Sequence, residues 1–168
     1  MFYEPVFRAF NRARVRYLVV GGVAVVLRGS DRLTADLDIM LDLEEGNLKR
    51  AIRVLSAMGF RPRAPVALKD FANAETRERW RREMGMLVMG LANDKDPLLS
   101  VDIMTESPIE FGPAYLRRET VRMSKLRVPV ASVSDLIRMK RKSGRPHDLD
   151  DMAFLKAAAR LKQEARTE

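Results

Sequence analysis

Two aspartates, Asp36 and Asp38, are the residues whose type and spacing point most directly to chemistry. They stand two positions apart in an apolar stretch that ends at Leu41, and this alternation predicts a strand. Successive side chains of a strand point to opposite faces, so both carboxylates should share one face. Like charges this close repel each other unless water or a cation separates them. Because Mg²⁺ prefers carboxylate and phosphate oxygens, the pair predicts a magnesium site.

A third acid, Asp102, has a similar setting, because it lies in the middle of the apolar segment 98–104. A carboxylate at such a position is costly to bury unless it is paired or bound to a metal. If the two predicted strands are neighbours, Asp102 can join Asp36 and Asp38 around one or two metal ions. The alternative is a pair of edge strands whose acids are simply solvated.

The glycine pair Gly21-Gly22 follows an apolar strand predicted for residues 16–20 and leads into a helix predicted for residues 22–28. Glycines at such a junction let the backbone approach a ligand closely, and a helix N-terminus offers free N–H groups to phosphate. Taken alone, the pair is better explained by a simple tight turn. The chain has neither a G-x-G-x-x-G nor a Walker sequence, so the residues support neither a Rossmann dinucleotide site nor a P-loop.

The remaining elements follow from hydrophobic periodicity and turn signals. Further strands are expected at 60–63, 84–91, 98–104, 119–123 and 126–130. Further helices are expected at 5–14, 44–58, 75–82, 132–142 and from residue 146 onward. Two pairs of strands should form hairpins, the second turning at Ser124 and Lys125. In the last helix, Leu149, Met152, Ala153 and Leu155 are expected to face inward.

These elements predict an α+β fold, in which helices flank a mixed β-sheet and a C-terminal helical pair closes it. A chain of 168 residues is typical of one domain. We therefore expect residues 1–168 to form a single domain, with a sheet core over residues 1–131 and a helical segment over residues 132–168.

Composition excludes several kinds of site. The chain has no cysteine and one histidine, which excludes a disulfide scaffold, thiolate metal sites and a cysteine nucleophile. The longest apolar run, residues 17–27, is too short to span a bilayer. We therefore expect a cytoplasmic protein that does not associate with a membrane.

The net charge of +8 comes from one segment of the sequence, residues 117–145. Its ten basic residues are Arg117, Arg118, Arg122, Lys125, Arg127, Arg138, Lys140, Arg141, Lys142 and Arg145. Only Glu119 and Asp135 oppose them, and the rest of the chain is neutral. A concentrated basic patch attracts polyanions such as nucleotide triphosphates or nucleic acid. The alternative is a solvated surface.

Several motifs occur in an order that resembles a known superfamily. In the N-terminal part of the chain, the motifs are Val20-Gly21-Gly22-Val23-Ala24, then Ser30, Arg32 and Thr34, then Asp36-x-Asp38, and later Asp102. In the C-terminal part, they are Ser132-Val133-Ser134-Asp135-Leu136-Ile137-x-x-Lys140 and Gly144-Arg145-Pro146-His147-Asp148-Leu149-Asp150-Asp151. Together they resemble the nucleotidyltransferase superfamily with the fold of DNA polymerase beta. Within it, the chain looks most like the small bacterial branch that includes abortive-infection toxins and lincosamide-resistance enzymes. The resemblance covers residues 16 to about 155.

The resemblance implies a role for each motif. Residues that bind the nucleotide would be Gly21, Gly22, Ser30, Arg32, Thr34 and Lys140. Asp36 and Asp38 would bind two Mg²⁺ ions, with Mn²⁺ as an alternative. Asp102 would bind a metal and help to deprotonate the acceptor hydroxyl. Many members carry serine where this chain has Gly22, so one side-chain contact is missing.

The sequence thus predicts a metal-dependent nucleotidyltransferase that moves a nucleoside monophosphate from an NTP, such as ATP, to a hydroxyl acceptor and releases pyrophosphate. The basic segment favours an RNA acceptor such as a tRNA end, with Arg141, Lys142 and Arg145 as acceptor contacts or as a solvated run. By resemblance, the protein could be a toxin that an antitoxin protein restrains. The alternatives are an enzyme that modifies an antibiotic or other small molecule, and a nucleotide-binding protein without turnover. The residues leave open the NTP, the acceptor, the oligomeric state and the role of residues 66–83.

Overall fold

A single mixed β-sheet organises the computed structural model, which describes residues 2–164 except the side chains of residues 147, 162 and 163. In the described chain the sheet has seven strands in the order β3-β4-β5-β2-β1-β7-β6. The strands are β1 (Tyr17–Val19), β2 (Asp36–Leu41), β3 (Phe60–Pro62), β4 (Val88–Asn93), β5 (Ser100–Met104), β6 (Glu119–Met123) and β7 (Leu126–Val130). The mixed sheet with flanking helices confirms the predicted α+β fold.

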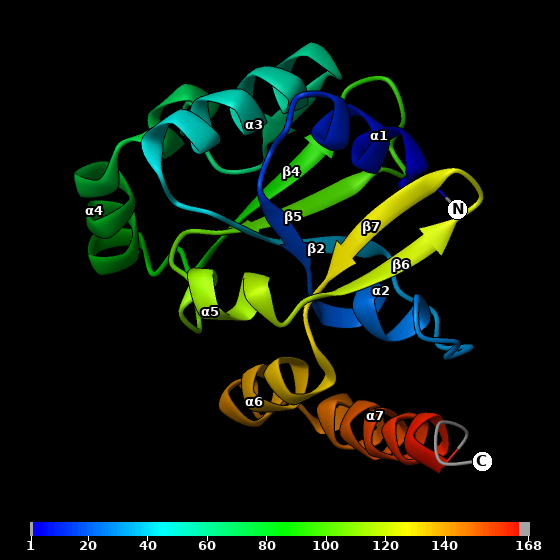
Figure 1. Ribbon diagram of the computed structural model, residues 1–168. Coiled ribbons are helices and arrows are strands. Elements are labelled where there is room, and N and C mark those ends of the chain that lie inside the picture. The colour runs from blue at the N-terminus through cyan, green and yellow to red at the C-terminus, as the bar shows by residue number, and fades with distance from the viewer. Residues whose placement is uncertain (1, 165–168) are drawn as a thin grey trace.

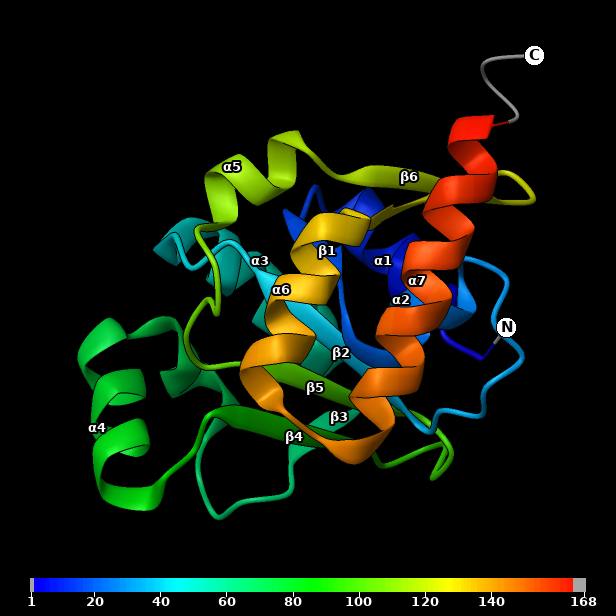
Figure 2. The same cartoon turned by 90° about the horizontal axis from the view of Figure 1, so that it is seen from below.

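Helices lie on both sides of this sheet (Figure 1). They are α1 (Glu4–Arg12), α2 (Gly21–Val26), α3 (Glu45–Ala57), the 3₁₀ helix η1 (Leu68–Ala72), α4 (Ala74–Met84), α5 (Phe111–Leu116), α6 (Val133–Ser143) and α7 (Pro146–Glu164). Helices α1 and α3 cover one face, whereas α6 and α7 lie side by side across the other (Figures 1 and 2). Among the described residues, no helix is long and apolar enough to cross a membrane.

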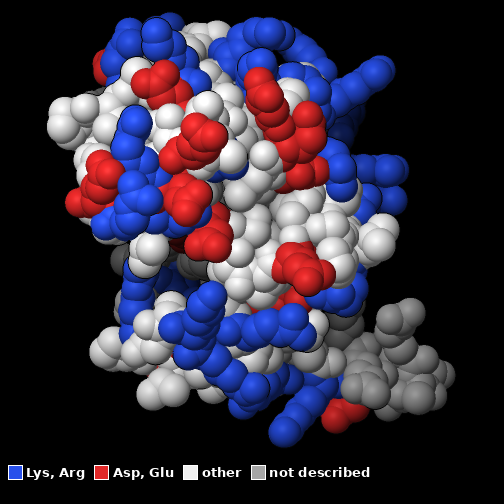
Figure 3. All heavy atoms as spheres, turned by 90° about the vertical axis from the view of Figure 1, so that its left-hand side faces the viewer, with Lys and Arg blue, Asp and Glu red and all other residues white. Residues whose placement is uncertain are grey.

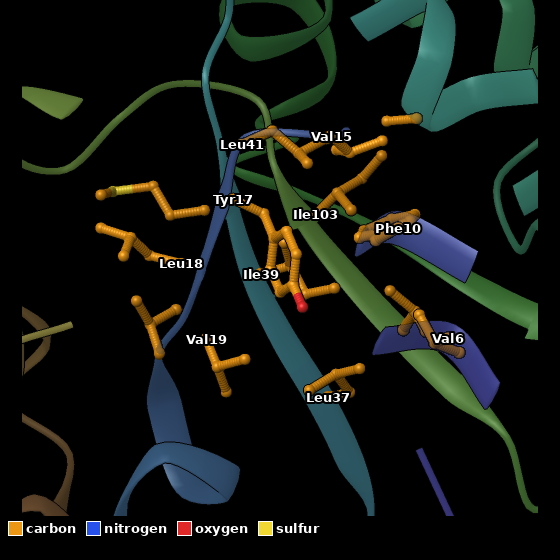
Figure 4. Packing of buried hydrophobic residues seen from close by; sticks show 14 of the residues in the cluster. Val6, Phe10, Val15, Tyr17, Leu18, Val19, Leu37, Ile39, Leu41 and Ile103 are labelled. Atoms are coloured by element: carbon orange, nitrogen blue, oxygen red, sulfur yellow. The ribbon is translucent and has the colours of Figure 1, made fainter. Parts of the chain in front are cut away.

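The core between the sheet and α1 explains which face of β2 is left for chemistry. Helix α1 buries Val6 and Phe10, and Leu37 and Ile39 of β2 are buried in the same cluster (Figure 4). The ring of Phe10 packs edge-on against Tyr17 of β1, with 5.2 Å between the ring centroids. Because side chains alternate along a strand, the residues between these apolar positions point to the other face.

The strand pairing confirms the neighbours that the sequence predicted. Strand β2 pairs in parallel with β5, β4 and β5 form an antiparallel hairpin, and so do β6 and β7. The second hairpin turns at Ser124, whose φ of 55° is in the left-handed region. The prediction that the acid-bearing strands are neighbours is therefore confirmed, and the alternative of two separate edge strands is wrong.

The boundaries of some elements differ from the prediction. The strand expected from residue 84 begins at Val88, because α4 continues to Met84 and ends at Gly85 with a φ of 62°. Met84 is therefore exposed at the end of α4. Sequence periodicity also missed α5 and η1, which are only six and five residues long.

The inward face of α7 is polar as well as apolar, which corrects part of the prediction. Leu155 is buried as expected, but Leu149 and Ala153 are exposed. Their place on the buried face is taken by Asp148 and Asp151, which are about 95% buried. The expected helical segment also included residues 165–168, which lie outside the described residues.

Candidate active site

Three carboxylates meet on the face of the sheet opposite α1. In the parallel register of β2 and β5, Asp38 lies directly beside Asp102, and Asp36 lies beside Ser100. Leu37 and Val101, which alternate with these residues, are fully buried on the other face. The register brings Asp36, Asp38 and Asp102 to one surface from segments that are more than sixty residues apart in sequence.

Burial and mutual repulsion make this cluster costly when all three groups are charged. Burial, followed by the neighbouring charge of Asp102, raises the pKa of Asp38 to about 6, although the Gly22 N–H donates to this carboxylate. Burial also raises the pKa of Asp102, with a second contribution from the charge of Asp36. A cation bound between these two carboxyl groups would therefore stabilise the charged form of both.

The carboxylate oxygens of this cluster are the kind of ligand that a hard divalent cation prefers. Asp102 Oδ1 is buried and has no hydrogen-bond donor among the described residues, and a cation would satisfy such an oxygen. As the side chains stand, no three Asp or Glu residues among the described side chains converge closely enough to hold an ion. Rotation of exposed carboxylate groups would therefore accompany binding, and Asp36 is exposed enough to move.

The glycine pair fits tightly against this cluster. Gly21 has a φ of 63°, and a Cβ atom at this position would lie 1.9 Å from Asp38 Oδ2. A Cβ atom at Gly22 would lie 2.6 Å from Thr34 Oγ1. The start of α2 therefore approaches Asp38 and Thr34 more closely than residues with side chains would allow.

A cavity of about 620 Å³ opens over these groups, between the sheet and the α6–α7 pair. Most of the predicted site residues line it, namely Gly21, Gly22, Arg32, Thr34, Asp36, Asp38, Asp102, Lys140, Lys142 and Arg145. Two predicted residues do not line it. Ser30 instead accepts a hydrogen bond from the backbone N–H of Arg32, and Arg141 lies exposed on α6. The fold thus gathers ten of the twelve predicted residues around one space.

The two cations expected to contact phosphates are held by the buried acids of α7. Lys140 Nζ donates to Asp148 Oδ1 at 3.0 Å and to Asp151 Oδ2 at 2.5 Å. Arg32 also pairs with Asp151. This network fixes both cations at the cavity wall, and it explains why α7 turns aspartates rather than leucine inward.

The basic segment of the sequence is divided in space. Arg122, Lys125 and Arg127 belong to the β6–β7 hairpin, whose turn lies far from α6 in Figures 1 and 2. Arg138 and Arg141 are exposed on α6, together with Lys142 and Arg145 at the cavity. Figure 3 shows basic side chains gathered across the lower helices on this side of the molecule. The basic residues of the segment are therefore divided between the hairpin and α6, and those of α6 form a basic surface that adjoins the cavity.

Sequence reasoning missed one residue beside the carboxylates, Arg63. It follows β3, and its backbone N–H donates to the Gly90 carbonyl at 2.9 Å. Its guanidinium donates to Ser100 Oγ at 2.5 Å and lies 3.7 Å from Asp36 Oδ1. No motif marked it, because its approach to Asp36 depends on β4 and β5 lying between the two segments in the sheet.

Comparison with solved structures identifies the fold. The chain aligns with lincomycin-bound lincosamide antibiotic adenylyltransferase LnuA at a TM-score of 0.60 and 18% identity, covering 94% of each chain. It aligns with ANT(2")-Ia in complex with adenylyl-2"-tobramycin at 0.59 and 10% identity, covering 99% of this chain and 95% of that one. It also aligns with a putative nucleotidyltransferase from Thermotoga maritima at a TM-score of 0.55 and 15% identity, covering 99% of this chain and 92% of that one. A comparison with curated protein sequences finds no match.

These alignments show that the chain shares its fold with solved nucleotidyltransferase structures. Residues 8–162 match the family described as "Nucleotidyltransferase of unknown function (DUF6036)", and the chain belongs to this family. The resemblance seen in the sequence is therefore confirmed, as is the prediction of a nucleotidyltransferase enzyme.

Proposed function

We propose that this enzyme transfers a nucleoside monophosphate from an NTP to a hydroxyl group of RNA and releases pyrophosphate. The observation that carries the proposal is the register of β2 and β5, which sets Asp38 beside Asp102 in a cavity that a basic helix adjoins. Carboxylates beside a close backbone approach suit a nucleotide triphosphate, and exposed cations of α6 suit a polyanionic acceptor.

The proposed nucleotide site lies on the α2 side of the carboxylates. The backbone of Gly21 and Gly22 would approach the phosphates, with Thr34 beside them. Arg32, whose guanidinium lies beside Gly22, and Lys140 would contact the phosphates, and Asp151 orients both cations. Because a rigidly held cation needs little reorganisation during the reaction, this arrangement favours stabilisation of charge on the triphosphate.

Asp36, Asp38 and Asp102 would hold one or two divalent cations, Mg²⁺ or Mn²⁺, which supply charge neutralisation for the phosphates when bound. The raised pKa of Asp102 suits a carboxylate that accepts the proton of the acceptor hydroxyl. The oxygen of that hydroxyl would then form a bond to the α-phosphorus while the bond to pyrophosphate breaks.

A transfer assay tests the proposal. Purified protein, Mg²⁺ and each α-labelled NTP are incubated with bacterial RNA, and the label in RNA and the released pyrophosphate are measured. Wild type and the exposed-residue control Asp150→Asn should label RNA, whereas Asp38→Asn and Asp102→Asn should not. Pyrophosphate release that needs a small hydroxyl compound and leaves RNA unlabelled would reject the RNA acceptor.

One observation favours a small-molecule acceptor as the second candidate. Leu87, Val88 and Met104 line one wall of the cavity, and an apolar wall suits a drug-sized ligand. The same assay with lincosamides and aminoglycosides as acceptors distinguishes the two candidates.

A toxin role and an antitoxin partner stay predictions from the resemblance. If the protein is a toxin, induced expression of wild type should stop bacterial growth, whereas Asp38→Asn should not. Equal growth with both proteins would remove the toxin role without affecting the proposed reaction.

A further inference from the structure

We propose that Arg63 is an acceptor-positioning residue that holds the RNA phosphate nearest to the reacting hydroxyl. The inference rests on the proposed function, because it assigns a subsite to its acceptor. It concerns the side of the carboxylate cluster away from Gly21, which no motif described.

The order of the strands separates the two sides of the cluster. The glycine pair follows β1, and β2 with Asp36 and Asp38 comes next in the sheet. Asp102 on β5 lies beyond β2, and β4 and β3 continue in the same direction. A triphosphate held near Gly21 therefore leaves the β5–β4–β3 side for the acceptor, and the acceptor hydroxyl must approach past Asp102.

Arg63 lies on this acceptor side and on the same face as Asp102. The β4–β5 register pairs Gly90 with Asp102, and Arg63 bonds to the backbone of Gly90. A Cβ atom at Gly90 would lie 3.3 Å from Asp102 Oδ1 and 3.6 Å from Arg63 Nη1. The missing side chain of Gly90 thus leaves the guanidinium and the carboxylate facing the same small space.

The contacts of Arg63 leave it able to bind a ligand. Ser100 Oγ is the only side-chain hydrogen-bond partner of Arg63 within residues 2–164, and the 3.7 Å separation from Asp36 exceeds hydrogen-bond length. The side chain is 53% exposed. Exposed ion pairs of this length stabilise folds little, so a structural role explains its position poorly.

A second arginine, Arg145, lines the cavity together with Asp102. Arg145, in the turn between α6 and α7, lowers the pKa of Asp102 by its charge, as Arg63 does. Figure 2 shows this turn lying over the β4 and β5 end of the sheet. The charges of two arginines thus act on Asp102, and a guanidinium fork suits a phosphate because two parallel N–H groups can bind two of its oxygens.

An RNA acceptor offers such a phosphate. The hydroxyl at the end of an RNA belongs to a sugar whose own phosphate links it to the preceding nucleotide. A hydroxyl beside Asp102 thus brings a phosphate within one sugar of the cluster, where Arg63 lies. A free nucleoside has the same hydroxyl but lacks the phosphate.

The test compares these two acceptors in wild type and variants. With the dinucleotide CpA, we expect Arg63→Ala to lower kcat/KM about 10- to 100-fold, the usual effect of losing a charge-assisted hydrogen bond. With adenosine as the acceptor, Arg63→Ala should match wild type. The KM for the NTP should stay unchanged, and Arg63→Lys should recover part of the loss.

Arg61→Ala is the matched control, because Arg61 lies two residues earlier on the same strand face and pairs with Asp94 instead. Equal losses in Arg61→Ala and Arg63→Ala would overturn the inference while leaving the proposed function intact, and so would a loss with adenosine or a raised KM for the NTP. Wild type that labels neither RNA nor CpA would instead reject the proposed function, and the inference would fall with it.

Discussion

Asp38→Asn should make the metal-free protein more stable at neutral pH while removing its activity. The pKa of Asp38 is about 6 in the folded protein against an ordinary value of 3.8. One pKa unit corresponds to about 1.4 kcal/mol, so the charged carboxylate costs the fold up to about 3 kcal/mol at pH 8. Asparagine avoids this cost, keeps the shape and can still accept from the Gly22 N–H.

The sign of the effect fixes its pH dependence. A pKa that is raised by folding contributes stability below the unfolded value and loses it as pH rises through the folded value. Wild type and Asp38→Asn should therefore differ by less than about 1 kcal/mol near pH 4. The difference should grow mainly between pH 4 and pH 6 and reach about 3 kcal/mol at pH 8.

Urea unfolding of both proteins with EDTA, from pH 4 to pH 8, measures this difference, and Asp150→Asn on the exposed face of α7 is the control. Addition of Mg²⁺ at pH 8 should stabilise wild type more than the variant, because a ligand of the folded state adds stability. A variant that is less stable than wild type at pH 8 in EDTA would refute the reasoning.

Three other results are expected. Gly21→Ala should lower transfer activity at least about 100-fold and raise the unfolding rate, because Gly21 has a positive φ and a Cβ atom there would clash with Asp38. Gly112→Ala is the control and should change neither quantity, because no atom lies within 4 Å of a Cβ placed at Gly112. Lys140→Met should lower the free energy of unfolding by about 3 kcal/mol in urea, since two buried carboxylates lose the ammonium group that they share. A loss below about 1 kcal/mol would contradict this network. RNA binding should weaken steeply as the salt concentration rises. Arg141→Ala should reduce the slope of log K for RNA binding against log salt concentration by about one. An unchanged slope would show that Arg141 of α6 does not contact the RNA.

The acid-bearing strands could be predicted from sequence because their signals are local. The alternation around Asp36 and Asp38 sets one face for carboxylates and one for the core, and an acid within an apolar strand demands an explanation wherever it occurs. The prediction that Asp102 joins this pair required the two strands to be neighbours, and their register then places Asp102 beside Asp38.

Other features depend on tertiary contacts that carry no local signal. Asp148 and Asp151 are buried because Lys140 reaches them from α6, and the apolar periodicity of α7 does not indicate their burial. The basic segment seemed continuous because sequence distance hides the separation of the hairpin from α6. Arg63 reaches Asp36 across two intervening strands, which nothing near residue 63 indicates.

The two ends of the sheet bear on how the protein behaves at high concentration. An edge strand with free backbone groups can pair with another chain and start aggregation. Here β3 has only three residues and includes Pro62, which has no N–H to donate, and β6 at the other end carries the exposed charge of Arg122. The edge strands β3 and β6 therefore disfavour backbone pairing with a strand of another molecule. This protects the chain against edge-to-edge self-association.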